Sequence, residues 1–307
     1  MITSICMNPS FDKTVEVDTL AIGEVNRIRT SRQDVGGKGI NVAIVARRLG
    51  LKVRCVGCVG RDGADRVSNA LNKEKIAHEF VKVNGAVRTN TKIVTGDGKG
   101  VTELNEPGSR IFDRELEEVF ELVKRSARDS EYLVLTGSLP PGCPPETYRD
   151  LMRAATGVPC ILDVGGEALN LGVEEKPFLI KPNLQELQDS VGMELRTMRA
   201  IRDAAMAYLK KGVQHVVVSM GSIGAVYVGE DASIFAPALK VKVKSTVGAG
   251  DAMIGGILKG LEREKDVARA FRYGVAAGAA SVMTEGTQLI VPADFLYLLD
   301  QVRVQEV

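Results

Sequence analysis

A glycine-rich turn followed at once by a carboxylate is the segment of this sequence best suited to chemistry. It reads Thr246-Val247-Gly248-Ala249-Gly250-Asp251 and leads into an apolar stretch with helical periodicity. Backbone N–H groups at a helix N-terminus attract an anion, and glycines let a ligand approach that backbone closely. Asp251 is either a base beside such an anion or a carboxylate that only stabilises the helix dipole. The segment by itself does not decide between these two roles.

A second glycine-rich segment, Gly36-Gly37-Lys38-Gly39-Ile40-Asn41-Val42-Ala43, also leads directly into an amphipathic stretch. It places a cation, Lys38, and an amide, Asn41, beside an open backbone. A Gly-Gly pair before a helix often forms a turn and nothing more. The segment is therefore either a simple turn or a second place where the chain can approach a polar ligand.

A third segment joins an apolar run to a helix start. The run Leu179-Ile180 ends at Lys181-Pro182, and Asn183 precedes the next predicted helix. Asn183 and Glu186 then occupy the N-cap and N3 positions, so a capping contact is the structural interpretation. The same amide and carboxylate can also hold water molecules on a magnesium ion.

Metal, redox and dinucleotide sites have little support in the sequence. The two histidines, His78 and His215, each precede an apolar run and have no partner motif. Cys55 and Cys58 share one strand-like run, where residues three apart point to opposite faces, so zinc binding is not expected there. Met253 occupies the third glycine position of a dinucleotide fingerprint, and no Walker A sequence occurs. A dinucleotide oxidoreductase is therefore disfavoured.

The composition narrows the class of partner. The chain has 307 residues, with 40 Lys and Arg against 39 Asp and Glu, so a net charge of +1 offers nucleic acid no long-range attraction. No apolar run approaches the ~20 residues that span a bilayer, and residues 1–6 lack a signal-peptide layout. The five cysteines have no framework spacing, which fits a reducing compartment. We expect a cytoplasmic protein with neither nucleic-acid nor membrane partners.

Alternating apolar runs and amphipathic stretches must position the residues above. Strands such as Tyr132–Leu135 and Val216–Val218 are continuously apolar, which is typical of parallel strands covered by helices on both faces. The pattern predicts a three-layer α/β sandwich. Up to residue 163 it predicts strands at 2–7, 53–59, 132–136 and 159–163 and helices at 38–49, 63–75, 113–127 and 145–156. A further strand is predicted over Lys240–Lys244, ahead of the helix that contains Asp251.

Two stretches instead alternate polar and apolar residues with period two. They are Lys13–Arg32 and Arg88–Asn105, the second with a turn at Gly96-Asp97-Gly98. This pattern predicts antiparallel strands with one solvated or ligand-facing side. Because no Pro- or Ser-rich linker surrounds them, we expect one domain over residues 1–307 with a small β lid, its strands inserted at about 13–35 and 86–105.

Taken together, these motifs carry a family resemblance. Gly37–Ala43 and Thr246–Asp251 resemble the two signatures of the ribokinase-like PfkB sugar-kinase family, and Asn183-x-x-Glu186 is similar to its magnesium motif. Three further motifs fit in order, namely Asn8-Pro9-Ser10-x-Asp12, Gly137-Ser138-Leu139-Pro140 and Ser219-x-Gly221-x-x-Gly224. The resemblance implies a ribokinase-like α/β/α sandwich with a mostly parallel central sheet and a small β-sheet lid. It also implies ATP-dependent phosphorylation of a sugar hydroxyl.

The resemblance implies a role for each matching residue. Asp251 would be the catalytic base, and Gly248, Ala249 and Gly250 would form the anion hole around the transferred phosphoryl group. Asn183 and Glu186 would place Mg²⁺ through water molecules. The ATP site would be lined by Lys181, Asn183, Ser219, Gly221, Gly224 and Thr246, and the sugar site by Asp12, Gly37, Lys38, Asn41 and Ser138. Where relatives often carry a serine soon after the aspartate, this chain has Asp163-Val164-Gly165-Gly166, so no role beyond structure is assigned to Asp163.

The lid gives the best indication of the substrate within the family. Alternation puts Arg88, Asn90 and Lys92 on one strand face, ~7 Å from each to the next. This basic row is either a solvated strand face or, facing the cleft and joined by Lys38, a site for a phosphosugar. The Lys38-containing motif and the lid row resemble those of 1-phosphofructokinases, which make fructose 1,6-bisphosphate from fructose 1-phosphate. Tagatose-6-phosphate kinases are the close alternative.

An alternative of another class is a catalytically silent regulator that binds a phosphosugar on the same fold. Such a protein would be expected to lose the base or the anion hole, and here Asp251 and the glycines before it are present. The expected partners are thus a small phosphosugar and ATP. The sequence does not fix the oligomeric state, but an open β lid with exposed edges invites pairing with a second lid to form a homodimer.

Overall fold

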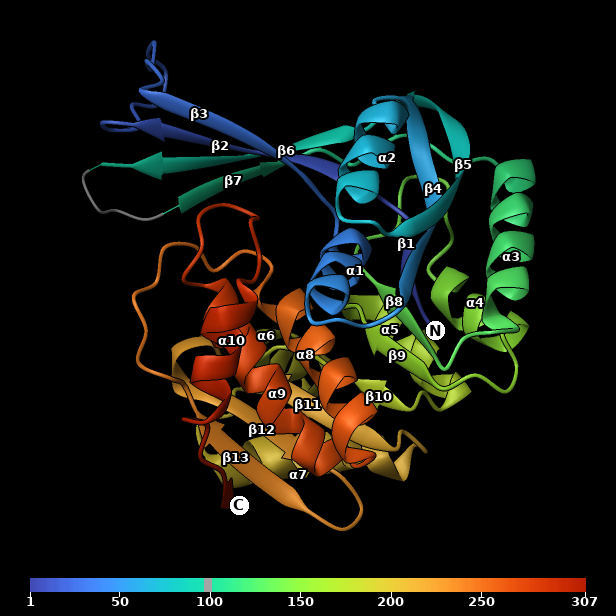
Figure 1. Cartoon of the computed structure of the whole chain (residues 1–307), viewed down its shortest axis with the longest axis vertical. Coiled ribbons are helices and arrows are strands. Elements are labelled where there is room, and N and C mark those ends of the chain that lie inside the picture. Colours follow the sequence, from blue (N-terminus) through green and yellow to red (C-terminus); the bar gives the residue numbers. More distant parts are fainter. Residues whose placement is uncertain (97–100) are drawn as a thin grey trace.

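The structure is a computed structural model that describes residues 1–96 and 101–307. Ten strands of the described residues form a main sheet in the order β14-β13-β12-β11-β10-β9-β8-β1-β4-β5 (Figure 1). Their bounds are β1 Ile2–Cys6, β4 Val53–Asp62, β5 Ala77–Ala86, β8 Tyr132–Thr136, β9 Cys160–Asp163, β10 Leu179–Ile180, β11 His215–Ser219, β12 Gly224–Val228, β13 Ser233–Pro237 and β14 Gln305–Glu306. Strands from β5 to β11 pair in parallel, whereas β11 to β14 pair antiparallel.

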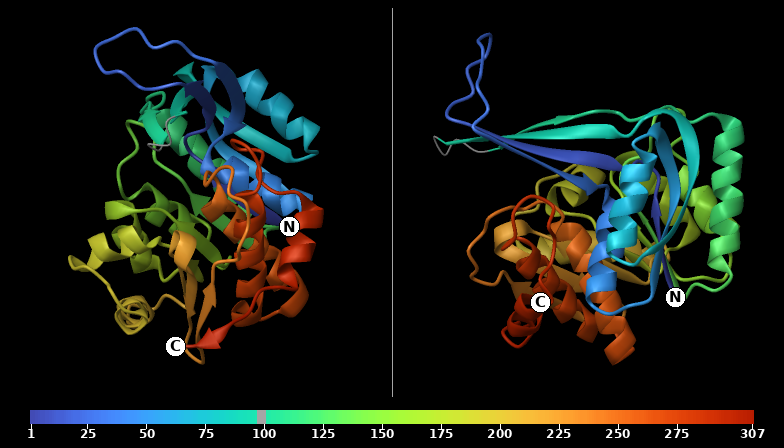
Figure 2. Two further views of the ribbon diagram at one scale, coloured as in Figure 1. Left: turned by 90° about the vertical axis from the view of Figure 1, so that its left-hand side faces the viewer. Right: turned by 45° about the horizontal axis from the view of Figure 1, so that its top comes forward.

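Helices cover both faces of this sheet, as Figure 2 (left) shows nearly edge-on. One face carries α1 Lys38–Arg48, α2 Ala64–Lys73, α8 Ala249–Glu264, α9 Val267–Ser281 and α10 Pro292–Leu299. The other carries α3 Asp113–Ala127, α4 Thr147–Ala154, α5 Gly166–Gly172, α6 Leu184–Val191 and α7 Met198–Lys210. The described residues also include two short 3-10 turns, η1 Val173–Glu175 and η2 Gly221–Ile223. The predicted three-layer α/β sandwich is confirmed, because continuously apolar strands such as β8 need cover on both faces.

Two details of the core follow the alternation of side chains along a strand. Cys55 packs into the core layer under α1, whereas Cys58 packs into the opposite layer and its thiol donates to the carbonyl of Met7 at 2.9 Å. The predicted opposite orientation of the two cysteines is confirmed. His215 stands at the start of β11, where its Nδ1 lies 2.9 Å from the hydroxyl of Tyr227.

A second sheet projects from the body as a lid (Figure 1). Its strands are β2 Ser10–Val17, β3 Thr30–Gly36, β6 Arg88–Thr95 and β7 Val101–Asn105, in the order β3-β2-β6-β7. The strands were expected to be antiparallel, but the central pair β2 and β6 is parallel. The reason is that β2 continues from β1 and β6 from β5, which run in the same direction in the main sheet. The turn predicted at Gly96-Asp97-Gly98 lies outside the described residues after Gly96.

The strand predicted over Lys240–Lys244 is wrong. The segment is irregular and joins β13 to α8. Its alternating lysines and valines fit a strand locally, but a strand also needs a neighbour to pair with. The backbone N–H of Lys244 instead donates to the carbonyl of Val282, at the end of α9, at 2.7 Å.

None of the described helices combines the length and the apolarity that are needed to cross a bilayer.

Candidate active site

The carboxyl ends of the parallel strands bring the predicted site residues to one edge of the main sheet. Thr136 ends β8, Asp163 ends β9, Lys181 follows β10 and Ser219 ends β11. In open α/β sheets this edge is where ligands bind, because loops and helix N-termini converge there. The sheet topology therefore gathers polar residues that are far apart in the sequence.

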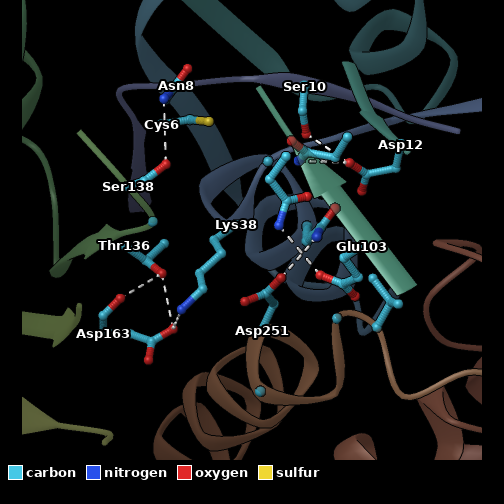
Figure 3. Close-up of a pocket in the computed structure, with 18 of the residues that line it drawn as sticks. Cys6, Asn8, Ser10, Asp12, Lys38, Glu103, Thr136, Ser138, Asp163 and Asp251 are labelled. Carbon is cyan, nitrogen blue, oxygen red and sulfur yellow. Dashed lines mark hydrogen bonds and ion pairs between the residues drawn. The ribbon is translucent and has the colours of Figure 1, made fainter. Parts of the chain in front are cut away.

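A cavity of about 660 Å³ opens at this edge, between the body and the lid (Figure 3). It brings together most of the residues predicted from the sequence, namely Asp12, Gly37, Lys38, Asn41, Arg88, Asn90, Lys92, Ser138, Lys181, Asn183, Glu186, Ser219, Thr246, Gly248, Gly250 and Asp251. Gly221, Gly224 and Ala249 line an adjoining cavity instead. We call the larger space the main cavity.

Asp251 lies at the bottom of the main cavity in the first turn of α8 (Figure 3). Gly248 is the N-cap of this helix. Its φ of 74° lies in the left-handed region, which is unfavourable for residues that have a side chain. The Asp251 carboxylate accepts a hydrogen bond from Asn41 Nδ2 at 2.8 Å. Burial raises the pKa of Asp251 to about 6, although the nearby Lys38 ammonium opposes the rise. The result is a fixed carboxylate that is more basic than usual, beside the first N–H groups of a helix, which have no acceptor within that helix.

A buried carboxylate stands between two lysines next to Asp251. Asp163 lies 3.1 Å from Lys181 Nζ and 3.7 Å from Lys38 Nζ, and Thr136 donates to it at 2.9 Å (Figure 3). Burial acts to raise the pKa of Asp163, but the two ammonium groups outweigh it and hold the pKa below its usual value. Asp163 in turn raises the pKa of Lys38, so Lys38 keeps its charge at the cavity. The sequence analysis assigned Asp163 no place in the site, whereas the structure puts it there.

The lid forms the opposite wall of the main cavity. Arg88, Asn90 and Lys92 all face this cavity, which excludes the interpretation that the row is a solvated strand face. Asn90 Nδ2 donates to a carboxylate oxygen of Asp12 at 3.3 Å. Lys92 is largely buried, and its ammonium lies 4.0 Å from a carboxylate oxygen of Glu103 on β7. Asn90 and Lys92 are therefore weakly paired, whereas Arg88 donates to the carbonyls of Glu106 and Asn8, both at 3.2 Å.

Several buried polar atoms at this cavity have no partner in the described structure. They are Oδ1 of Asn41, Oδ1 of Asn90 and Nε of Arg88. Unpaired buried polar groups are rare in folded proteins because each costs free energy. Their presence on one cavity indicates a ligand with both hydroxyl groups and negative charge.

Sequence reasoning missed residues that cross-strand pairing places in the site. Lys92 pairs with Glu103 and Asn90 with Asn105 in the register of β6 and β7, so the face that holds the basic row also holds these two residues. Asn8, quoted only as part of a motif, donates from Nδ2 to Ser138 Oγ at 3.4 Å across the cavity wall (Figure 3). The alternation within Arg88–Asn105 is visible in the sequence. The register between its two strands is not, and this register is what places Glu103 and Asn105 in the site.

The adjoining cavity has a volume of about 580 Å³ and mostly apolar walls. It meets the main cavity at Ser219, Thr246 and Gly250. Its walls come from η2, the irregular segment before α8, and the facing sides of α8 and α9. An apolar space joined to a polar one suits a ligand with a flat ring at one end and anionic groups at the other.

Asn183 and Glu186 cap α6 reciprocally. The side-chain oxygen of Asn183 accepts from the N–H of Glu186, and a carboxylate oxygen of Glu186 accepts from the N–H of Asn183, both at 2.8 Å. The predicted capping contact is confirmed. Because both residues also line the main cavity, the second carboxylate oxygen of Glu186 is available to a ligand there.

Comparison with known proteins gives one consistent answer. A family profile described as "pfkB family carbohydrate kinase" matches residues 5–294 of this chain. The chain is 33% identical to the 1-phosphofructokinase of Bacillus subtilis over 308 residues, covering 99% of each chain. It is 35% identical to the 1-phosphofructokinase of Escherichia coli K12, covering 92% of this chain and 90% of the relative.

A solved structure supports the same comparison. The crystal structure of phosphofructokinase-2 from Escherichia coli, in complex with substrates and products, superposes with a TM-score of 0.91. The two sequences are 30% identical, and the match covers 98% of each chain. Nearly the whole of this chain therefore matches a solved relative.

Proposed function

We propose, from the premise that this chain belongs to the pfkB family of carbohydrate kinases, that it transfers the γ-phosphoryl group of ATP to fructose 1-phosphate. The product would be fructose 1,6-bisphosphate. The observation that carries the proposal is the basic lid row, Arg88 and Lys92 with Asn90, facing Asp251 across one cavity. The same cavity thus contains a base, Asp251, and basic residues that can bind the phosphate of a phosphorylated sugar.

The sugar hydroxyl oxygen attacks the γ-phosphorus of ATP, and the bond to the oxygen that bridges to the β-phosphate breaks. Asp251 accepts the hydroxyl proton, and its raised pKa of about 6 makes it a better acceptor than an ordinary aspartate. Asn41 holds the carboxylate in position. The N–H groups that follow Gly248 stabilise the charge on the transferred group, since they lack helical partners.

Two lysines that line the cavity provide positive charge for the two anionic substrates, ATP and the phosphosugar. Lys38 and Lys181 each form an ion pair with Asp163 and would contact phosphate oxygens of ATP or of the transferred group. Glu186 and Asn183 fit a magnesium ion bound through water, because one Glu186 oxygen remains outside the cap. When bound, Mg²⁺ neutralises charge on the ATP phosphates. The adenine ring of ATP suits the apolar adjoining cavity.

The phosphosugar would lie between the lid and Asp251. Arg88 and Lys92 would bind the phosphate that it already carries. The unpaired oxygens of Asn41 and Asn90 accept hydrogen bonds, which suits sugar hydroxyl groups. Asp12, held by Ser10 at 2.8 Å, offers a further acceptor.

ADP release measured against a panel of sugars tests the proposal. The panel contains fructose 1-phosphate, tagatose 6-phosphate, fructose 6-phosphate and free fructose. We expect the highest kcat/KM for fructose 1-phosphate and little turnover of free fructose, which cannot engage the basic row. A higher kcat/KM for tagatose 6-phosphate would establish the alternative, and sugar binding without ADP release would establish the silent regulator.

The lid also offers a surface to a second copy of this chain. All five residues of β7 are exposed, including Val101 and Leu104, and its outer edge is unpaired among the described strands. An exposed edge with apolar side chains is covered in most stable proteins. We expect a homodimer paired through the lids, measurable as twice the chain mass by light scattering. A Leu104→Lys variant should shift the protein to monomer.

The five free cysteines fit work in a reducing compartment, so the cytoplasm is the proposed location. A fluorescent fusion in intact cells tests this directly.

A further inference from the structure

Leu289 combines a strained backbone with complete burial. It lies between α9 and α10 and has φ of 63°, the left-handed region that non-glycine residues rarely occupy. The other non-glycine residues with positive φ among the described ones are Lys75, Lys176 and Lys265, which are exposed and end helices. Leu289 ends no helix and is only 1% exposed. Such strain persists where the surroundings enforce it, and it clusters at functional sites.

Hydrogen bonds hold three successive carbonyl groups around this residue. Arg48 Nη1 donates to the carbonyl of Gln288 at 2.5 Å and to that of Ile290 at 3.3 Å. The hydroxyl of Thr284 lies 2.7 Å from the carbonyl of Leu289 itself. The backbone of Leu289 is therefore fixed from both sides.

Arg48 is itself anchored. It lies at the end of α1, and its Nε donates to Glu74 at 3.1 Å while Nη2 forms an ion pair with the same carboxylate. A bidentate pair of this kind gives the guanidinium one orientation. The strained segment is thus attached to the rigid body of the molecule.

The Leu289 side chain presses against the start of α8. A Cβ placed on Gly248 would lie 2.6 Å from Leu289 Cδ2, so the leucine methyl occupies the space next to the Gly248 Cα. Gly248 is the left-handed N-cap whose conformation aims the following N–H groups. A shift of Leu289 would let this turn relax.

We propose that Leu289 is a positioning residue for the anion hole and that Arg48 holds it in place. Leu289 restrains Gly248 in the left-handed conformation, so that the first N–H groups of α8 meet the transferred phosphoryl group without reorganisation. Neither Leu289 nor Arg48 lines the main cavity, so neither contacts the substrates there. The inference rests on the proposed function only in that a phosphoryl group is received at this turn.

Arg48→Ala tests the anchor. We expect kcat to fall by about tenfold to a hundredfold, because small displacements of a catalytic group cost that much, while KM for both substrates changes less than about threefold. The matched control is Arg47→Ala, on the same helix turn, whose side chain donates only to the Glu74 carbonyl at 3.4 Å. A folded Arg48→Ala protein with wild-type kcat would overturn the proposal.

Chemical rescue separates positioning from general destabilisation. A cavity of about 410 Å³ beside Arg48, also lined by Thr284 and Gln288, leaves room for a small guanidinium ion. Methylguanidinium should restore part of the lost kcat in Arg48→Ala and leave Arg47→Ala unchanged. If it restores the melting temperature but not kcat, Arg48 has a structural role alone.

Leu289→Gly tests the contact without the strain, since glycine adopts positive φ freely. We expect kcat to fall at least about fivefold, because the methyl group against Gly248 is gone. Amide hydrogen exchange over residues 247–251 should be faster in Arg48→Ala and in Leu289→Gly than in the wild type. This readout needs no turnover, so it decides the inference even if fructose 1-phosphate proves not to be the substrate. Unchanged exchange over these residues, with wild-type kcat in Leu289→Gly, would refute it.

Discussion

The two walls of the main cavity are built in different ways. The body wall consists of Asp251, Asp163, Lys38 and Lys181, which stand at strand ends and helix starts of the main sheet. Its carboxylates are buried and bonded, and their pKa values are displaced in opposite directions. The lid wall consists of Arg88, Asn90, Lys92 and Glu103 on a four-stranded sheet that projects from the body.

The packing of the two walls differs as well. The α8 residues around Asp251 are buried, whereas every residue of β7 is exposed. Fixed, desolvated charges are preorganised for a reaction, while a thin sheet with few buried contacts can open and adapt. The comparison indicates that chemistry belongs to the body wall and choice of sugar to the lid wall. Variants of each wall should therefore separate kcat from selectivity.

The largest effect is expected in the body wall. Asp251→Asn should lower kcat by about a hundredfold or more with little change in KM, because the amide cannot accept the proton. The control is Asp266→Asn, since Asp266 caps α9 away from the cavity. If the two variants lose activity equally little in a steady-state assay, Asp251 only stabilises its helix and the division of roles fails.

The second-largest effect on activity is expected from a variant in the lid wall. Lys92→Ala should lower kcat/KM for fructose 1-phosphate by about tenfold to a hundredfold, the cost of a charge-assisted hydrogen bond, and leave KM for ATP unchanged. It should also reduce the selectivity against tagatose 6-phosphate. Lys13→Ala serves as control, because Lys13 lies on β2 of the same sheet but does not line the cavity. If Lys92→Ala keeps the sugar preference of the wild type, the lid does not select the sugar.

The pH dependence tests the role of Asp251 in the body wall. Because burial raises the pKa of Asp251 to about 6, kcat/KM should fall about tenfold per pH unit below pH 6 as the base becomes protonated. Stability should show the opposite sign. Between the ordinary aspartate pKa of 3.8 and about 6 the folded state holds the extra proton, so stability declines as pH rises through this window. Asp251→Asn should abolish this decline in thermal melts.

Glu186 lies at the edge of the body wall, and its effect should be limited to the metal. Glu186→Gln should raise the Mg²⁺ concentration that gives half-maximal rate by about fivefold, since a neutral amide binds the water shell more weakly. KM for the sugar should stay the same. An unchanged magnesium titration with a lower melting temperature would leave Glu186 with only its capping role.

The smallest effect should come from Glu103, which sharpens the description of the lid wall. Its carboxylate lies 4.0 Å from the Lys92 ammonium and would compete with an incoming phosphate. Glu103→Gln should therefore lower KM for fructose 1-phosphate by about twofold to fivefold, the value of a half-exposed ion pair. The gain should shrink at high salt. A higher KM would mean that Glu103 binds a sugar hydroxyl instead.

Much of this arrangement could be predicted from local sequence. The strands and helices that the hydrophobic period predicted up to residue 163 lie within a few residues of those positions, because side-chain alternation and helical spacing are set locally. Strand β5 was not predicted, since this edge strand of the main sheet has few buried residues. The capping pair Asn183 and Glu186 and the glycine-rich start of α8 were likewise readable, since each is a contact between near neighbours. Family resemblance then joined these segments into one site.

Tertiary structure decided what depends on distant partners. The parallel pairing of β2 with β6, the irregular path of Lys240–Lys244 and the place of Glu103 all follow from which strand lies alongside, which no local period encodes. Asp163 is the last residue of a predicted strand, but its charge is set by Lys38 and Lys181, which come from other elements. A local pattern fixes the element in which a residue lies, whereas Coulomb interactions and packing depend on distance in space, and only the folded chain supplies that distance.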